Sequence, residues 1–384
     1  MKVNYDILLL GDLYSDHMVR FVRNLKQVNA DIIIDGFQPS KKDKIIPTDY
    51  QTYFRELTIA EFSHYFNSIP GLRTTEIIAN WRKHFHTFAK GKHYDIVNIH
   101  FPNYVLRYII NDVKRIADKI VVIPWGSDVY RVSNRKKKIL KHVFDAADFV
   151  IARDRFAEDC QKLFGVPSEK MIQGGMGSET IDFILDHKKD VSTDEAKRCL
   201  GIKDSYAISC GYNASPAQRH LRIIEAIGHI KKQLPENLIL IFPVTYPPNK
   251  SYVDELKSAV REIGIKALFY DRYLDLEQLF MLRQATDMFI HVQTTDANNA
   301  SLKEYLLLEK NCINGGWMTY PDLEKDGYKP FYVVETVDDM EEAILEAYTK
   351  GALLIKKETL LNIEKLGYRK SSQVVNNLFM SISK

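Results

Sequence analysis

A strand-to-helix junction stands at residues 206–220, where the chain reads YAISCGYNASPAQRH. The first five residues of this run are apolar and rich in β-formers, and a polar loop with a single glycine follows them. Ser215 is a good helix N-cap and Pro216 a good first helical residue, so the pattern predicts a helix that begins there. A strand, a short loop and a helix in this order form the repeating unit of a parallel sheet covered by helices.

The same unit repeats on both sides of the junction. Before it, we expect strands at 5–10, 31–35, 95–100, 119–124 and 148–152, and helices at 15–28, 76–89, 103–117, 134–145 and 154–164. After it, we expect strands at 237–243, 266–270, 287–292, 311–314 and 331–334, and helices at 216–232, 251–262, 275–285, 301–309, 337–349 and 356–380. Near-continuous apolar strands that alternate with amphipathic helices indicate parallel sheets buried on both faces.

The pattern breaks once, at 184–200, where the chain is polar, charged and poor in β-formers. A length of 384 residues also suits two domains better than one core. The sequence therefore predicts an α/β protein with two Rossmann-like, doubly wound domains at 1–188 and 189–360. The last segment, 361–384, is expected to be a helix that returns to the N-terminal domain.

Composition excludes several classes of function. The balance of 53 basic and 50 acidic residues gives a net charge of +3, which is too small to suggest nucleic-acid binding. No apolar stretch approaches the roughly 20 residues that span a bilayer, and the N-terminal MKVNYDILLLGD reads as a first strand rather than a signal peptide. Four cysteines without CxxC spacing fit a reducing compartment, so a cytoplasmic location is expected.

In doubly wound sheets, ligands bind beyond the carboxyl ends of the strands. The loop after 206–210 offers the start of a helix, whose free N–H groups and partial positive charge suit a phosphate. The candidate binding residues of this loop are Gly211, Asn213, Ser215, Arg219 and His220. An ordinary turn with a solvated arginine is the alternative interpretation.

Two further loops of the second half carry candidate ligand contacts. The proline-dense stretch 242–249 contains Thr245 and Tyr246. It is either a rigid loop whose side chains contact a ligand or a rigid connector. The stretch 291–304 opens from a buried strand into a polar loop, and a helix is expected near Ser301. Its candidates are the carboxylates of Asp296 and Glu304, together with Asn299, Ser301 and Leu302 at the helix start.

The first half has two candidate loops of its own. At 124–131 the chain reads PWGSDVYR; Gly126 would allow close backbone approach, and Trp125 and Tyr130 offer aromatic faces for a sugar. Asp128 is either a general base or a structural cap. At 11–17, Gly11 opens the first strand-to-helix loop, and Asp12 and His17 are candidates for removing a proton from a hydroxyl.

Several of these motifs resemble one known family. The run 125–130, WGSDVY, resembles the WGxDxY element of bacterial 4-acetamido-4,6-dideoxygalactose (Fuc4NAc) transferases, which are inverting enzymes of the GT-B fold. Asn213, Ser215, Arg219 and His220 match that family's N-x-S-x-x-x-R-H-like loop in character. The runs 242–247 (FPVTYP) and 252–255 (YVDE) resemble its P-x-x-Y-P and Y-I-D-E elements. The resemblance spans roughly 90–320.

The resemblance implies a GT-B glycosyltransferase with a nucleotide-sugar donor, such as a dTDP- or UDP-sugar, and a polyprenyl-diphosphate-linked saccharide acceptor. No DxD motif stands at the end of an expected strand, and the helix starts at 215 and 301 together with Arg219 could neutralise a leaving diphosphate, so no metal and no cofactor are expected. The candidate base is ranked as Asp12, then Asp128, then His17. One feature departs from the resemblance. The Asp296-x7-Glu304 spacing is closer to the E-x7-E pattern of retaining GT4-like transferases, so inversion is favoured only by the WGSDVY and PVTYP elements.

Basic clusters lie at 81–85 with Lys90 and Lys92, and at 135–138 with Lys141 and His142. Basic and aromatic residues together suit an anionic membrane surface, so peripheral contact with the inner face of the membrane is one expectation. A solvated helix face is the other. The alternatives to a transferase are a non-catalytic nucleotide-sugar-binding protein with the same fold, an epimerase and a phosphorylase.

Overall fold

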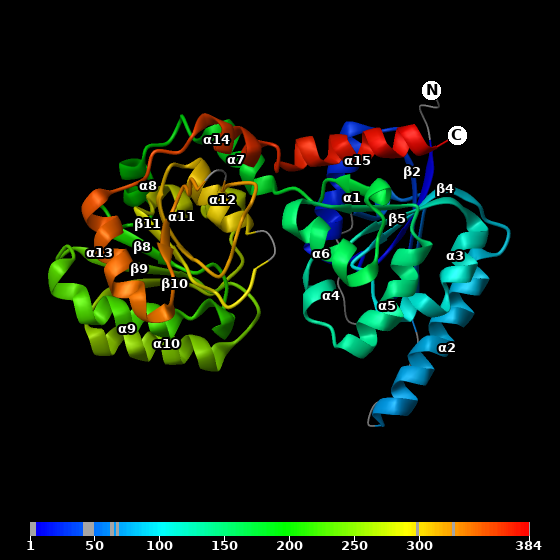
Figure 1. Ribbon diagram of the computed structural model, residues 1–384, viewed down its shortest axis with the longest axis horizontal. Coiled ribbons are helices and arrows are strands. Elements are labelled where there is room, and N and C mark those ends of the chain that lie inside the picture. Colours follow the sequence, from blue (N-terminus) through cyan, green and yellow to red (C-terminus); the bar gives the residue numbers. More distant parts are fainter. Residues whose placement is uncertain are drawn as a thin grey trace. The chain divides into compact units, whose positions relative to one another are not determined.

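The computed structural model describes residues 5–40, 50–61, 65–66, 69–296, 299–324 and 327–383. The chain forms two compact units (Figure 1). Unit 1 contains Met1–Gly177 and Tyr368–Lys384, and unit 2 contains Ser178–Gly367. None of the helices in the described ranges is both long and apolar enough to cross a membrane.

Unit 1 is a seven-stranded parallel sheet with the strand order β3-β2-β1-β4-β5-β6-β7. Its strands are β1 (Asp6–Leu10), β2 (Ile33–Ser40), β3 (Glu56–Glu61), β4 (Tyr94–His100), β5 (Ala117–Ile123), β6 (Phe149–Ala152) and β7 (Met171–Gln173). Its helices are α1 (Asp16–Val28), α2 (Pro70–Ala89), α3 (Ile110–Ile116), α4 (Ser127–Tyr130), α5 (Asn134–Ala146), α6 (Asp154–Phe164) and α15 (Tyr368–Ile382), with short 3-10 turns η1 (Tyr50–Tyr53), η2 (Tyr104–Tyr108) and η3 (Ser168–Lys170).

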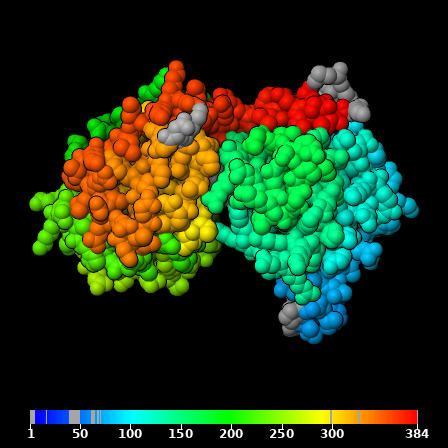
Figure 2. Space-filling model, viewed as in Figure 1, coloured from blue at the N-terminus to red at the C-terminus, as the bar shows by residue number. Residues whose placement is uncertain are grey.

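Alternation along β1 explains why helices cover both faces of this sheet. Leu8 and Leu10 pack with the side chains of α2, α3, α5 and α6, whereas Ile7 and Leu9 pack with those of α1 and α15. All four are fully buried. Helix α15 lies along α1, where the Tyr5 hydroxyl donates to Asn376 Oδ1 at 2.8 Å. Its red side chains form a continuous surface with those of unit 1 in Figure 2.

Unit 2 is a six-stranded parallel sheet with the order β10-β9-β8-β11-β12-β13. Its strands are β8 (Tyr206–Cys210), β9 (Leu238–Pro243), β10 (Lys266–Tyr270), β11 (Met288–His291), β12 (Asn311–Gly315) and β13 (Tyr332–Val334). Its helices are α7 (Glu179–His187), α8 (Thr193–Cys199), α9 (His220–Ile230), α10 (Lys250–Ile263), α11 (Leu276–Ala285), α12 (Ala300–Leu307), α13 (Met340–Lys350) and α14 (Lys357–Glu364), with 3-10 turns η4 (Pro216–Gln218), η5 (Lys231–Gln233) and η6 (Val337–Asp339).

The structure differs from the expected elements in a few places. Strands β3 and β7 are additional, and the polar stretch 184–200 contains helix α8. The Ser192 hydroxyl caps α8 by accepting from the Glu195 amide, and the helix packs against α11. The sequence-based boundary at residue 188 assigns α7 to the first domain, whereas α7 packs against α11, α12 and α14 of unit 2.

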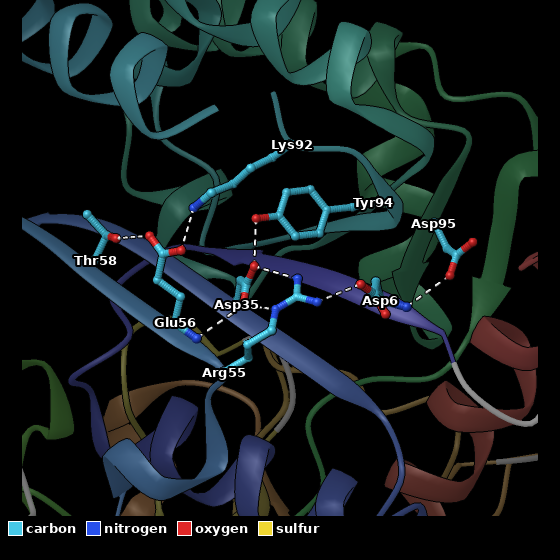
Figure 3. Close-up of polar contacts among 8 residues, drawn as sticks. All are labelled: Asp6, Asp35, Arg55, Glu56, Thr58, Lys92, Tyr94 and Asp95. Carbon is cyan, nitrogen blue, oxygen red and sulfur yellow. Dashed lines mark hydrogen bonds and ion pairs between the residues drawn. The ribbon is translucent and has the colours of Figure 1, made fainter. Parts of the chain in front are cut away.

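A buried carboxylate joins the amino ends of β1 to β4 (Figure 3). Asp35, on β2, is 1% exposed and binds the Arg55 guanidinium through both oxygens, with Nε to Oδ1 at 3.0 Å and Nη2 to Oδ2 at 2.7 Å. The Tyr94 hydroxyl and the Glu56 amide donate to the same carboxylate at 2.8 and 3.1 Å. Arg55 also reaches Asp6 at 2.8 Å. These contacts hold the edge strand β3 to the sheet.

Replacing Arg55 by glutamine removes the bidentate partner of a buried charge. We expect Arg55→Gln to lower the unfolding free energy of unit 1 by about 2 kcal/mol. Urea unfolding followed by circular dichroism at pH 7 measures the change. Arg115→Gln is the control, because its exposed pair with Asp112 on α3 is worth at most about 0.5 kcal/mol. Equal midpoints for the two variants would contradict the assigned role of Asp35.

Candidate functional site

The loop after β8 is shaped by Gly211. Its backbone has φ +62, and a Cβ at this position would lie 2.7 Å from His220 Nε2 and 2.8 Å from Gln218 Oε1. Only glycine fits that space. Farther along, Asn213 Oδ1 accepts from the Ser215 amide at 2.9 Å, and the Ser215 hydroxyl accepts from the Ala217 amide at 3.3 Å. These two contacts close successive turns of the loop.

The helix expected to start at Ser215 begins later. Ser215 caps the 3-10 turn η4, and α9 starts at His220. Arg219 separates the two because its backbone is left-handed, with φ +60. A non-glycine residue rarely adopts this conformation, and it cannot continue a helix. The predicted helix N-terminus at 215 is therefore wrong by one short turn.

The neighbours of Arg219 are both buried and hold this backbone in place. Gln218 Nε2 donates to Gln293 Oε1 at 2.7 Å, and His220 Nδ1 lies 3.2 Å from the Tyr252 hydroxyl. Burial lowers the pKa of His220 to about 4, so its ring is neutral at pH 7. His220 therefore anchors the loop, whereas the sequence suggested a donor to a diphosphate.

Arg219 itself lies at the carboxyl ends of β8 and β11. Its Nη1 donates to the Val292 carbonyl at 3.5 Å, and its Cζ lies 4.7 Å from the centroid of the Trp317 ring. Among the residues that the structure describes, no carboxylate forms an ion pair with it. Within the described part of the chain, the site thus holds a half-buried guanidinium without a carboxylate partner.

The start of α12 is organised by a buried histidine. His291 Nδ1 lies 2.8 Å from Asn314 Oδ1, and Asn299 Nδ2 lies 2.8 Å from His291 Nε2. These partners fit a neutral ring with its proton on Nδ1, and burial lowers the pKa of His291. Asn299 Oδ1 in turn caps α12 by accepting from the Leu302 amide at 2.7 Å. Leu302 was expected to offer that amide to a ligand, but the cap already uses it.

The two acids of this region have different surroundings. Asp296 is half-buried, and its Oδ2 accepts from the Tyr320 hydroxyl at 2.9 Å and lies 3.7 Å from His291 Nε2. Glu304 is 2% exposed; its Oε1 accepts from the Ser178 hydroxyl at 2.8 Å, and its other oxygen pairs with Arg283. Both oxygens of Glu304 are engaged inside unit 2. Ala297 and Asn298 lie outside the described residues.

Further contacts bring the neighbouring candidates together. The Ala214 amide donates to the Tyr246 carbonyl at 2.6 Å, which joins the loops after β8 and β9. Tyr246 is 55% exposed, and Thr245 next to it is half-buried. The Ser301 hydroxyl accepts from Arg283 Nη2 at 3.1 Å. The donor-side candidates therefore gather at the carboxyl ends of β8, β9 and β11.

In unit 1, the loops after β1 and β5 come together. A Cβ on Gly11 would lie 2.7 Å from the His100 carbonyl oxygen, so the end of β1 passes close against the end of β4. Asp12 Oδ1 accepts from Gln38 Nε2 at 3.2 Å. The exposed ring of His17 lies edge-on to Trp125, with centroids 5.3 Å apart.

The turn that follows Trp125 depends on Asp128. Gly126 has φ +109, and Asp128 Oδ1 accepts from the Gly126 and Trp125 amides at 2.7 and 3.0 Å. Burial raises the pKa of Asp128 to about 6. These contacts favour the structural cap over the general base. The Tyr130 hydroxyl also has a partner within the protein, because it donates to Asp159 on α6 at 2.7 Å.

Sequence reasoning missed several residues of the unit 2 site. Trp317, Gln293, Gln218, Tyr212 and Tyr320 all lie among the loops at the carboxyl ends of its strands. The run Gly315-Gly316-Trp317, which begins at the last residue of β12, was a signal that the sequence offered for Trp317, since small residues beside an aromatic ring at a strand end are unusual for a connector.

The architecture identifies the fold of this chain. Two Rossmann-like doubly wound units, each with its polar loops at the carboxyl ends of a parallel sheet, form the fold of the GT-B glycosyltransferases, as expected from the sequence. Residues 6–154 match the family described as glycosyl transferase 4-like. No curated protein matches the chain in sequence.

Several solved structures share the fold. A glycosyltransferase from Rickettsia africae ESF-5 has a TM-score of 0.72 and 14% identity over 99% of each chain. Sucrose-phosphate synthase from Thermosynechococcus elongatus has a TM-score of 0.69 and 12% identity over 98% of this chain and 99% of that one. Anabaena HepE in complex with UDP-glucose has a TM-score of 0.58 and 14% identity over 99% of this chain and 97% of that one. At these identities the likeness is one of fold.

Proposed function

We propose that the protein transfers a sugar from a nucleoside-diphosphate sugar to a saccharide acceptor. The observation that carries this proposal is Arg219, a half-buried guanidinium without a carboxylate partner among the described residues. It lies at the carboxyl ends of parallel strands, where such folds bind ligands. Guanidinium groups recognise phosphates through paired, charge-assisted hydrogen bonds. Anabaena HepE, which shares the fold, binds UDP-glucose.

The donor would then be held by three neighbouring loops. Arg219 binds the diphosphate, and the start of α12, whose first turn is closed by the Asn299 cap, adds the partial positive charge of a helix N-terminus. Asp296 accepts hydrogen bonds from sugar hydroxyls, because its carboxylate is oriented by the hydrogen bond from the Tyr320 hydroxyl. Thr245 and the exposed ring of Tyr246 contact the nucleoside. The donor we propose is a UDP- or dTDP-sugar, the class that the resemblance to the Fuc4NAc transferases implies.

Removing the guanidinium tests the diphosphate contact. We expect Arg219→Gln to weaken binding of UDP and dTDP by about 10- to 100-fold, the usual effect of losing charge-assisted hydrogen bonds. Isothermal titration calorimetry measures the dissociation constants. Arg222→Gln is the control, since Arg222 lies three residues on in α9 and pairs on the surface with Glu225 and Asp338. Equal binding by the two variants would refute the role of Arg219.

For the transfer itself, we propose that Asp12 is the base and that the anomeric configuration is inverted. The acceptor oxygen bonds to the anomeric carbon, the bond from that carbon to the diphosphate breaks, and Asp12 takes the hydroxyl proton. Asp128 is less suited because its carboxylate holds the turn at Trp125 and Gly126. Inversion is favoured because Glu304, the second acid of the retaining-type spacing, is engaged by Arg283 and Ser178.

Loss of the base should affect turnover and leave donor binding intact. We expect Asp12→Asn to lower kcat by about 10²- to 10⁴-fold, the usual contribution of a general base, with the donor dissociation constant within twofold of wild type. Asp118→Asn, an exposed substitution in unit 1, should leave kcat unchanged. Proton NMR of the product anomeric centre tests inversion. A retained configuration, or an Asp12→Asn rate within threefold of wild type, would refute this mechanism.

The acceptor we propose is linked to a polyprenyl diphosphate, as part of bacterial surface polysaccharide assembly, and it is reached at the inner membrane face. Helices α2 and α5 both pack on η2 and α3, so their basic residues cover one side of the unit 1 sheet. Arg82 and Lys83 on α2 and Lys136 and Lys138 on α5 are exposed. Ile69 and Leu72 at the start of α2 and Tyr108 at the end of η2 add exposed apolar surface.

Charge reversal tests the membrane contact. We expect wild type to co-sediment with vesicles that contain anionic phospholipid, and the triple change Lys136→Glu, Lys137→Glu and Lys138→Glu to reduce the bound fraction severalfold, because each basic residue near such a surface contributes about 1 kcal/mol. A triple change of Lys203, Lys232 and Lys266 to glutamate in unit 2 is the matched control. Binding that is insensitive to anionic lipid, or equal loss in both variants, would count against the proposal.

A further inference from the structure

Trp317 occupies a fixed place in the turn after β12. Its indole N–H donates to the Gln293 carbonyl at 2.7 Å, and the Met318 amide closes the turn onto the Gly315 carbonyl at 3.0 Å. The ring lies against Gly315, where a Cβ would be only 2.5 Å from ring atom Cζ2. The ring therefore has two constraints, one polar and one steric, and both fix its plane.

The guanidinium of Arg219 lies over that ring, with Cζ 4.7 Å from the centroid. An aromatic face attracts a cation, and the attraction is larger when both groups are partly desolvated. Among the described residues, the guanidinium otherwise makes one hydrogen bond, to the Val292 carbonyl, and at 3.5 Å that bond is long. The ring is therefore the main contact of the guanidinium in the described part of unit 2.

The backbone of Arg219 is tied to the same turn. Gln293 binds Trp317 through its backbone carbonyl, and its side-chain Oε1 accepts from Gln218 at 2.7 Å and from the Tyr212 hydroxyl at 3.1 Å. The Thr294 amide donates to the Ala217 carbonyl at 2.9 Å. Gln293 thus connects the loops after β8, β11 and β12. These contacts fix the backbone of Arg219 through Gln218, and they fix the Trp317 ring on which its guanidinium lies.

We propose that Trp317 is a positioning residue that holds the Arg219 guanidinium ready for the donor diphosphate. A long, flexible side chain loses conformational freedom when it binds, and a side chain already ordered loses less. Trp317 then strengthens diphosphate binding without touching the donor's reacting atoms. The inference rests on the proposed function, because it assumes that Arg219 binds the diphosphate.

The test is a double-mutant cycle read by calorimetric titration with UDP and dTDP, and with uridine as a probe that lacks the diphosphate. We expect Trp317→Leu to weaken UDP or dTDP binding about fivefold and to leave uridine binding within twofold. In the Arg219→Gln background, Trp317→Leu should change binding less than twofold. Trp317→Phe, which keeps an aromatic face, should stay within threefold of wild type. In turnover assays, Trp317→Leu should raise the donor KM while kcat stays within threefold.

Trp317→Met, which keeps an apolar side chain of similar reach, replaces Trp317→Leu if that variant does not fold, and the same changes are expected. Lys356→Ala is the control, because it breaks a cation–aromatic contact with Tyr328 elsewhere in unit 2. Equal weakening by Trp317→Leu with and without Arg219, or equal loss of uridine and UDP binding, would overturn the positioning role. A wild-type protein that binds neither UDP nor dTDP would overturn the proposed function, and this inference with it.

Discussion

Burial of both faces of each sheet is the constraint that decides where chemistry can take place in this protein. In β1, the side chains from Ile7 to Leu10 are fully buried, and alternate ones enter opposite helical layers. A polar group inside such a strand must find partners within the protein, because burying it without hydrogen bonds is costly. Groups that meet a ligand are therefore confined to the carboxyl ends, where strands give way to loops.

Asp35 and Arg219 show two outcomes of this constraint for a charged side chain. Asp35 lies near the amino ends of the strands, and its carboxylate accepts from Arg55, Tyr94 and the Glu56 amide, so its charge is fully compensated. Arg219 lies at the opposite ends, in unit 2, and has an aromatic ring and a backbone carbonyl as neighbours. The first arrangement stabilises a sheet edge. The second leaves a positive charge available to an anion.

The buried strands and most helices could be predicted from the sequence because their burial leaves a clear apolar pattern. The strands that it missed, β3 and β7, are the two edges of the unit 1 sheet, where polar residues such as Glu56 can face solvent and a strand can be as short as Met171–Gln173. Helix α8 was missed because its Ser192 cap and charged turns support a helix without a long apolar stripe. The candidate loops could be located as well, because each one directly follows a strand with a clear apolar pattern.

Which side chains in those loops face a ligand could not be predicted, because their partners are distant in the chain. Gln293 joins Gln218, Tyr212 and Trp317 through one side chain and one carbonyl, and no local pattern records that convergence. The left-handed backbone at Arg219 costs about 1 kcal/mol and persists because buried neighbours on both sides hold it. The position of the guanidinium is thus set by backbone and ring. A carboxylate partner would fix it as well, but it would also cancel the charge that binding requires.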